Sequence, residues 1–327
     1  MAGDSDLAQA LWYVGPGRVE IREERLGALA GGHVRVRALY GAISRGTESL
    51  IAEGRVPVGE FQRMRAPFMA GNFPFPVKYG YATVGTVEAG LPELIGRNVF
   101  VLHPHQDRFD VPIEAAAPVH EDIPLSRAVL AANMETALNA TWDAAPGPNG
   151  RIVIVGAGVV GALVAFICAR IEDAEVTLVD ISPERAELAR ALGVNFALPD
   201  NAPTDCDFVF HASATGAGLT TALNAAADEA TIIELSWYGT GVVAVPLGGA
   251  FHSRRLKLIS SQVGRVAPSH RQTWTHRMRL EAAIKLTAHP HLDVLLAPAI
   301  AFPELSAQIS DILKPQSGVL CQLISYP

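Results

Sequence analysis

The chain has 327 residues, a length that suits two domains, and 49% of them are hydrophobic, which is enough for two cores. Charged residues make up only 18%, too few for a disordered chain, and the net charge of −7 without a basic run argues against a nucleic-acid surface. We expect neither a signal peptide nor a membrane span, because no apolar run reaches ~18 residues. Three scattered cysteines without a Cys-x-x-Cys pair favour a reducing, cytoplasmic setting.

The first third of the chain is predicted to be rich in strands. Strand-like runs separated by glycine and proline turns cover residues 18–23, 33–39, 81–88 and 98–102. Residues 54–76 contain several prolines and predict a long loop beside a pocket. From residue 124 to residue 145 the pattern becomes helical, and a Pro-Gly-Pro-Asn-Gly stretch then ends it.

The most informative stretch begins with a short apolar run at 152–155, typical of a buried parallel strand. It leads into Gly156-Ala-Gly158-Val-Val-Gly161, then into an apolar helix, and a second strand ends on Asp180. A strand, a glycine turn, a helix, a strand and an acid in this order form the dinucleotide-binding fingerprint. The other reading, a glycine turn that only packs a β–α–β unit, accounts less well for the acid.

The fingerprint assigns a role to each of its residues. Gly156 permits the tight turn, Gly158 lets the backbone approach a pyrophosphate, and Gly161 lets the helix pack on the strand. Asp180 would accept a hydrogen bond from a ribose 2′-hydroxyl but repel a 2′-phosphate, so we predict NAD rather than NADP. The further cofactor-binding residues expected are Val159, Val160, Ile181, Arg185, Ala212 and Arg254, with Arg185 beside the adenine and Arg254 on a phosphate.

Beyond Asp180 the alternation of strands and helices continues. A helix is predicted from Ser182 to Leu192, strands at 207–211, 230–236, 242–246 and 256–263, and a second helix at 277–287. We interpret the apolar run 242–246 as an unprotected edge strand, which predicts a homodimer. A final strand at 319–325 lies outside the alternation and is predicted to return to the first domain.

Four local motifs resemble the medium-chain dehydrogenase/reductase superfamily over nearly the whole chain. Gly41–Glu48 is similar to its catalytic-cysteine turn, Gly80–Val87 to its GHExxGxV strand, Gly96–Val99 to its GDRV turn and residues 151–192 to its nucleotide half. The sequence at 43–48 is most similar to the bacteriochlorophyllide-type dehydrogenases. The resemblance implies an α/β fold, with a GroES-like β-barrel domain at 1–122 and 289–327 and a Rossmann doubly wound parallel sheet at 123–288.

The zinc ligands of that superfamily are missing from this chain. The resemblance places Ser44, Tyr81 and either Ala132 or Asn133 at the three ligand positions. Zinc requires about three protein ligands of nitrogen, sulfur or carboxylate type. The four-cysteine loop of the structural zinc site is absent as well. We therefore predict a metal-free enzyme.

Without zinc, other groups must transfer the proton. The resemblance places Thr47 at the hydroxyl that relays a proton, with Glu48 next to it, although a hydroxyl beside an acid is also an ordinary capping arrangement. Tyr81 could act as a general acid if Lys78 lowers the pKa of its phenol. Alternatively, Tyr79 and Tyr81 simply fill the space of the missing metal site.

Further residues are expected to line a substrate pocket. The histidine pair His103 and His105 could bind a metal, but without a nearby cysteine it is more typical of a polar loop beside the substrate. Glu135 could serve as a base or be a solvated helix acid. The complete expected pocket set is Ser44, Tyr79, His103, His105, Asn133 and Glu135.

Together these features predict a zinc-independent oxidoreductase that transfers hydride between NAD(H) and a small organic alcohol or carbonyl compound. Two alternatives stay open. One is a zinc-free reductase of activated double bonds, of the quinone or enoyl type. The other is a non-catalytic NAD-binding protein. Neither a nucleic acid nor a membrane is expected as a partner.

Overall fold

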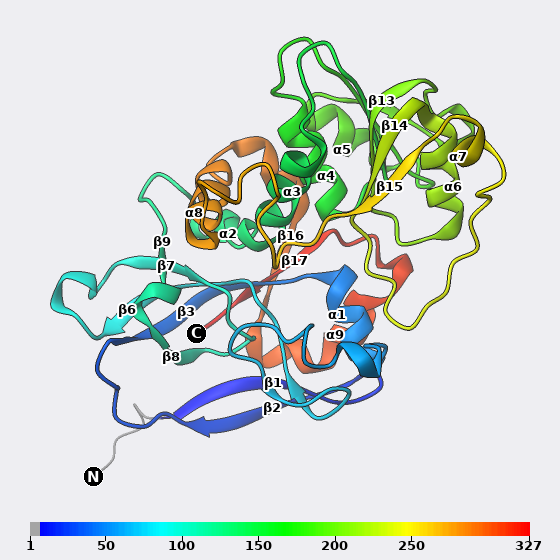
Figure 1. Ribbon diagram of the computed structural model, residues 1–327. Helices are drawn as coiled ribbons and strands as arrows, with labels where there is room; N and C mark the ends of the chain where they lie inside the picture. Colours follow the sequence, from blue (N-terminus) through cyan, green and yellow to red (C-terminus); the bar gives the residue numbers. More distant parts are fainter. Residues whose placement is uncertain (1–6) are drawn as a thin grey trace. The chain divides into compact units, whose positions relative to one another are not determined.

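A computed structural model describes residues 7–327, which form two compact units (Figure 1). The first unit comprises residues 7–132 together with Ile284–His289 and Leu296–Pro327. The second comprises Asn133–Ala283 and Pro290–Leu295. Across the described residues, no helix has the length and apolar character needed to cross a membrane.

The first unit is built from two sheets. The smaller has the strand order β2-β1-β5-β4, with β1 at Leu7–Gly15, β2 at Arg18–Arg25, β4 at Ala70–Gly71 and β5 at Val77–Lys78. The larger has the order β16-β17-β3-β6-β7-β9, and β8 also pairs with β3. Its strands are β3 (His33–Ile43), β6 (Thr83–Ala89), β7 (Asn98–Val101), β8 (Arg108–Pro112), β9 (Ala117–Pro118), β16 (Leu296–Ala301) and β17 (Cys321–Ser325).

The last strand completes this larger sheet. β17 lies between β16 and β3, and it pairs with β3 in antiparallel fashion so that Gln322 is opposite Ile43. This pairing is the return predicted from the sequence. The helices of the unit are α1 (Arg45–Ala52), α2 (Leu125–Ala128) and α9 (Leu305–Leu313), and α1 packs against α9 (Figure 1).

The second unit contains one parallel sheet with the order β12-β11-β10-β13-β14-β15. Its strands are β10 (Arg151–Val155), β11 (Glu175–Val179), β12 (Asn195–Ala197), β13 (Cys206–His211), β14 (Ala226–Glu234) and β15 (Lys257–Ser260). Its helices are α3 (Ala131–Ala144), α4 (Val159–Cys168), α5 (Arg185–Leu192), α6 (Gly216–Ala225), α7 (Ala250–Ser253) and α8 (His276–Leu286), with α3 and α8 crossing the unit boundaries. In β10 and β11 every residue after the first is buried, as expected for strands covered on both faces.

The chain leaves β10 toward β11 on one side and β13 lies on the other side, so the order of the sheet reverses there. Ligands of open α/β sheets bind at such a switch point, outside the carboxyl ends of the strands. In the second unit, the residues that follow β10, β11, β13 and β14 are therefore the candidates for a ligand site.

The predicted edge strand at 242–246 is wrong. These residues form a loop between β14 and α7, and Val242 is 96% exposed. Pro246 cannot donate a ladder hydrogen bond, and nearby glycines favour turns over a strand. The edge of the sheet is β15 instead, where the apolar side chains of Leu258 and Ile259 are each about 40% exposed.

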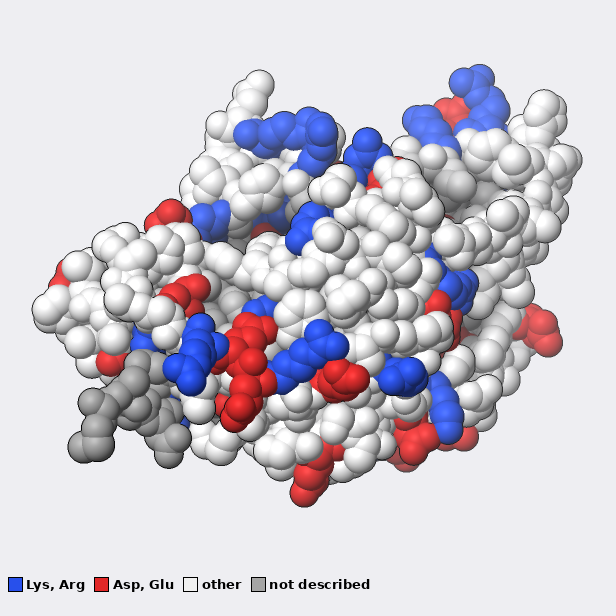
Figure 2. Space-filling model, turned by 90° about the horizontal axis from the view of Figure 1, so that it is seen from below, with Lys and Arg blue, Asp and Glu red and all other residues white. Residues whose placement is uncertain are grey.

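Most of the face shown in Figure 2 is uncharged, and in its lower half acidic and basic side chains lie close to one another. That lower half therefore has no extended basic patch. The three cysteines, Cys168, Cys206 and Cys321, are buried and free. The cytoplasmic location expected from them stays a prediction.

Candidate functional site

Two of the three fingerprint glycines are required by the local geometry, and the third leaves space open. Gly156 has φ of +110°, and a Cβ atom there would lie 2.7 Å from the backbone nitrogen of Ser213. A Cβ atom on Gly161 would lie 1.9 Å from the carbonyl oxygen of Gly156, so only glycine lets α4 approach the turn. At Gly158 no heavy atom lies within 4 Å of the Cβ position, so this part of the turn faces open space. This is the cradle that a pyrophosphate needs at the start of a helix.

Asp180 holds this turn in place. One carboxylate oxygen, Oδ2, accepts a hydrogen bond from the backbone nitrogen of Ala157 at 2.7 Å, and Oδ1 accepts one from Ser182 at 2.9 Å. A carboxylate oxygen can accept two hydrogen bonds, so each retains capacity for a ribose hydroxyl.

The remaining expected cofactor residues divide into two groups. Val159 and Val160 begin α4, Ile181 is 84% exposed after β11, Arg185 begins α5 and Ala212 follows β13. All five belong to turns or helix starts at the carboxyl edge of the sheet. The residues present at this edge therefore fit a dinucleotide.

Arg254 does not belong to this group, and the expected contact with a phosphate is wrong. Its guanidinium donates to the carbonyl oxygen of Ala226 at 2.7 Å and lies 3.9 Å from the carboxylate of Asp205. Ala226 begins β14 and Asp205 precedes β13, so Arg254 lies at the amino ends of the strands. Gly156 and Asp180 follow the carboxyl ends of parallel strands, which form the opposite edge of the sheet.

In the first unit, three predicted residues come together. The phenol of Tyr81 is hydrogen-bonded to the side chains of Ser44 and Thr47. Burial raises the pKa of Tyr81 to about 12, while these two hydrogen bonds act in the opposite direction. Tyr81 is therefore a neutral hydrogen-bond donor at physiological pH. Tyr79 packs edge-on against it, with ring centroids 6.0 Å apart.

The suggestion that Lys78 lowers the pKa of Tyr81 is wrong. The Lys78 ammonium donates to the carboxylate of Glu24 at 2.6 Å and to the side-chain oxygen of Gln106 at 2.8 Å. Residues in a strand alternate between faces, but Lys78 ends the short strand β5 and the chain then turns at Gly80. Closeness in sequence therefore does not bring the side chains of Lys78 and Tyr81 together.

Glu48 is fully buried and anchors the turn that carries Ser44 and Thr47. Its Oε2 accepts a hydrogen bond from the Tyr13 hydroxyl at 2.7 Å and lies 2.8 Å from Nε2 of His105. Its Oε1 accepts a hydrogen bond from the backbone nitrogen of Ser44, the residue that precedes α1. Glu48 thus acts as a buried capping residue, which is the alternative that its position next to Thr47 left open.

Neither histidine of the predicted pair lines an open loop. His103 is 4% exposed and stacks on Phe109 with centroids 3.7 Å apart. Burial lowers the pKa of His103 to about 3, so the ring is neutral at physiological pH. His105 is completely buried against Glu48. The two residues belong to the core, and the expectation of a polar loop beside the substrate is wrong.

Glu135 is neither a free base nor a solvated acid. Its Oε1 accepts a hydrogen bond from Nε of Arg279 at 3.0 Å, and both side chains are almost completely buried. Burial raises the pKa of Glu135, and the charge of Arg279 opposes this effect. Asn133, also expected in the pocket, is 8% exposed near the start of α3.

The donor set at the former ligand positions does not fit zinc. Ser44 and Tyr81 offer hydroxyl groups that are hydrogen-bonded to each other, and Ala132 offers no donor atom. Among residues 7–327, no group of three histidine, cysteine, aspartate or glutamate side chains could hold a metal ion.

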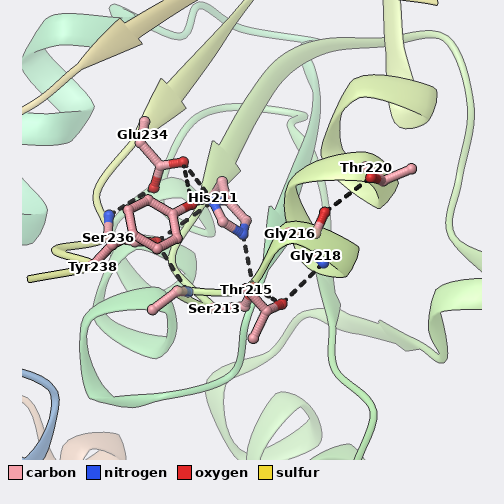
Figure 3. Close-up of polar contacts among 10 residues, drawn as sticks. His211, Ser213, Thr215, Gly216, Gly218, Thr220, Glu234, Ser236 and Tyr238 are labelled. Atoms are coloured by element: carbon pink, nitrogen blue, oxygen red, sulfur yellow. Dashed lines mark hydrogen bonds and ion pairs between the residues drawn. The ribbon is translucent and has the colours of Figure 1, made fainter. Parts of the chain in front are cut away.

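A polar cluster in the second unit was not predicted from the sequence (Figure 3). His211 ends β13 and is completely buried; its Nδ1 lies 2.7 Å from Oε2 of Glu234, which ends β14. Its Nε2 lies 2.7 Å from the hydroxyl oxygen of Ser213. Glu234 also accepts hydrogen bonds from the backbone of Ser236 at 2.7 Å and from the hydroxyl of Tyr238 at 3.0 Å. Two neighbouring apolar strands that both end on a titratable residue are the signal that could have revealed it.

Comparison with known proteins gives similarity in structure alone. No protein-family model matches the chain, and no curated protein matches it in sequence. A short chain alcohol dehydrogenase from Escherichia coli CFT073, solved with the cofactor NADH, superposes with a TM-score of 0.77 at 16% identity, covering 98% of this chain and 99% of that one. L-idonate 5-dehydrogenase from Escherichia coli K-12 gives a TM-score of 0.80 at 15% identity, covering 98% of each chain.

A third structure, 2R,3R-butanediol dehydrogenase from Bacillus subtilis, gives a TM-score of 0.76 at 14% identity, covering 97% of this chain and 99% of that one. These similarities extend over nearly the whole chain, so the chain shares the fold of these three dehydrogenases. This agrees with the α/β fold that the motifs implied.

Proposed function

We propose that this protein is an NAD(H)-dependent oxidoreductase that transfers hydride between the nicotinamide and an organic alcohol or carbonyl substrate, without zinc. The observation that carries the proposal is the glycine turn, where Gly156 and Gly161 leave no room for a side chain, Gly158 faces open space and Asp180 accepts a hydrogen bond from the backbone of Ala157. Structures of the same fold include one solved with NADH and others named as dehydrogenases of small alcohols, which supports the proposal.

The nicotinamide, when bound, supplies or accepts the hydride. The chain contributes binding and proton transfer. Backbone N–H groups at the start of α4 bind the pyrophosphate, and Asp180 accepts from a ribose hydroxyl. The neutral phenol of Tyr81, oriented by Ser44 and Thr47, donates its hydrogen to a substrate oxygen as negative charge develops there.

The experiment is a substrate screen that follows NADH absorbance with ketones, quinones and enones side by side. Turnover of ketones supports the proposed activity. Turnover restricted to quinones or enones would replace it with a double-bond reductase. Tight NADH binding without turnover of any class would leave a non-catalytic NAD-binding protein.

We also propose that the protein is a homodimer in which β15 of one copy pairs with β15 of the other. β15 is one of the two edges of the parallel sheet, and all four of its residues are exposed. An open edge with apolar side chains favours pairing across a two-fold axis. Light scattering at micromolar concentration tests this: a mass near 34.7 kDa, that of one chain, would contradict it.

A further inference from the structure

The hydrogen bonds around His211 have a defined direction. The carboxylate of Glu234 can only accept, so Nδ1 of His211 carries a hydrogen and donates it, and Nε2 is left as an acceptor for the hydroxyl of Ser213. The hydroxyl oxygen of Thr215 accepts from the backbone nitrogen of Gly218 and lies 3.0 Å from that of Ser213. The hydrogen of the Ser213 hydroxyl is therefore directed at a base, and the base is oriented by an acid (Figure 3).

Ser213 lies in a turn that joins strand β13 to helix α6. The next residue, Ala214, has φ of +53°, a conformation that is uncommon outside glycine. A Cβ atom on Gly218 would lie only 2.0 Å from the hydroxyl oxygen of Ser213, so this oxygen rests against the first turn of α6. The positive end of a helix favours negative charge on such an oxygen.

The same turn offers hydrogen-bond donors. In the described part of the chain, the backbone N–H groups of Gly216 and Ala217 donate no hydrogen bond, whereas that of Gly218 is capped by Thr215. Ala217 is exposed and Gly216 half-buried. A nucleophile, an oriented base and free N–H groups beside them are the parts that acyl transfer requires.

The two ends of this chain of hydrogen bonds differ in how deeply they are buried. His211 is completely buried and the Glu234 side chain is 12% exposed, whereas Ser213 is half-buried and Thr215 is exposed. The reactive hydroxyl is thus the end that a small molecule can reach.

We propose that Ser213 is the nucleophile of a second, acyl-transfer site that accepts small activated esters, with His211 as its general base and Glu234 as the positioning residue. Oγ of Ser213 forms a bond to the ester carbonyl carbon while its proton moves to Nε2 of His211. The bond from that carbon to the leaving oxygen then breaks, and the leaving group takes the proton from Nε2. Water cleaves the acyl-serine by the reverse sequence of proton transfers. This reaction is chemically distinct from hydride transfer and uses no nucleotide, although its turn adjoins the glycine turn, where a Cβ atom on Gly156 would lie 2.7 Å from the backbone nitrogen of Ser213.

The test is labelling of the full chain, without added nucleotide, by a fluorophosphonate probe, followed by peptide mass spectrometry. We expect the label on Ser213 in the unaltered protein and none after Ser213→Ala. The matched control is Ser269, whose hydroxyl lies 2.9 Å from Nδ1 of His270, a ring that contacts no carboxylate among residues 7–327. Ser269→Ala should leave labelling unchanged. An unlabelled Ser213 in the folded, unaltered protein would overturn the proposal.

Hydrolysis of p-nitrophenyl acetate provides the second readout. Loss of a general base typically costs about 10²–10⁴-fold in rate, so we expect a loss of this size for His211→Gln. For Glu234→Gln we expect slower hydrolysis and a rate midpoint at lower pH, because the carboxylate that favours the protonated imidazole is gone. A purely structural role of Glu234 would lower the rate without moving the midpoint. Equal rates for the unaltered, Ser213→Ala and His211→Gln proteins would contradict the proposal.

Discussion

Glu135 and Arg279 are 144 residues apart in sequence, yet they form an almost completely buried ion pair that joins α3 to α8. The Arg279 guanidinium also donates to the side chain of Asn139 and to the backbone of Val263 and Arg265. Removing one member of a buried pair leaves the other charge without compensation, at a cost of about 3–5 kcal/mol.

We therefore expect Arg279→Met to lower the free energy of unfolding by roughly 3–5 kcal/mol, measured by urea denaturation. The matched control lies on the same helix, where the half-exposed Arg277 pairs with Glu281 at 2.6 Å. Arg277→Ala should cost only about 0.3–0.5 kcal/mol. Similar losses in the free energy of unfolding for the two variants would show that the buried ion pair stabilises the protein no more than the exposed one.

Asp180 should determine which dinucleotide binds. Its carboxylate would repel a 2′-phosphate, so we expect tighter binding of NADH than of NADPH in fluorescence titrations. Asp180→Ala should weaken NADH binding by roughly tenfold or more, because a hydrogen bond to a charged group contributes about 1.5–3 kcal/mol. The exposed Asp200→Ala is the control. Tighter binding of NADPH to the unaltered protein would contradict the assignment.

Tyr81 and Thr47 should carry the proton in hydride transfer. We expect Tyr81→Phe to lower turnover by about 10²–10⁴-fold, as for the loss of a general acid, and Thr47→Val to lower it as well, with NADH binding retained in both. Because the pKa of Tyr81 is raised to about 12, the phenol stays protonated throughout the usual assay range. The pH profile should therefore show no loss of activity from deprotonation of Tyr81 below about pH 11. Near-normal turnover in both variants would place the proton donor elsewhere.

His103 should make stability depend on pH. Its pKa falls from 6.5 to about 3 on folding, so below pH 6.5 the unfolded chain takes up a proton that the folded chain does not. The contribution of His103 to the free energy of unfolding is therefore complete above pH 6.5. As the pH falls below that value, the free energy of unfolding decreases by about 1.4 kcal/mol per pH unit.

Urea denaturation at pH 7 and pH 5 measures this loss. We expect His103→Phe, which cannot be protonated, to lose roughly 2 kcal/mol less than the unaltered protein over that interval. His120, whose side chain is 79% exposed, is the control, and His120→Ala should leave the pH dependence nearly unchanged. An identical pH dependence in the His103→Phe variant would show that the buried ring does not titrate on unfolding.

Metal analysis tests the proposed independence from zinc. Ser44, Tyr81 and Asn133 provide neither a thiolate nor an imidazole, so we expect the purified protein to contain far less than one zinc per chain. Chelation should leave both activity and stability unchanged. One tightly bound zinc per chain, lost together with activity on chelation, would overturn the assignment.

The nucleotide part of the fold was predictable because its signals are local. Arg151 to Asp180 spans one strand, one helix and one further strand, and periodicity within such a window identifies each of them. The same argument failed at Val242, where the apolar run forms a loop in the structure. Apolar character alone does not distinguish a strand from an exposed loop.

The predicted site residues were assigned less well, because their roles depend on partners far away in sequence. Lys78 pairs with Glu24, 54 residues away, and His105 with Glu48, 57 residues away. Nothing near Lys78 or His105 indicates these partners. Ser44, Thr47 and Tyr81 do come together, because Ser44 and the first turn of α1 follow β3, Tyr81 precedes β6, and β3 and β6 are neighbouring strands of one sheet.

The position of β17 has a consequence for biosynthesis. This strand occupies a central place in the larger sheet of the first unit, between β16 and β3, and the ribosome makes it after the whole of the second unit. The second unit is nearly continuous in the chain and can reach its native state during translation. In the first unit, by contrast, β8 can pair with the first half of β3, but Tyr40–Ile43 of β3 stay unpaired on that side until β17 has been made. Nascent chains stalled before residue 321 should therefore carry a folded second unit and an incomplete first one, a state in which chaperones would protect the open edge of β3.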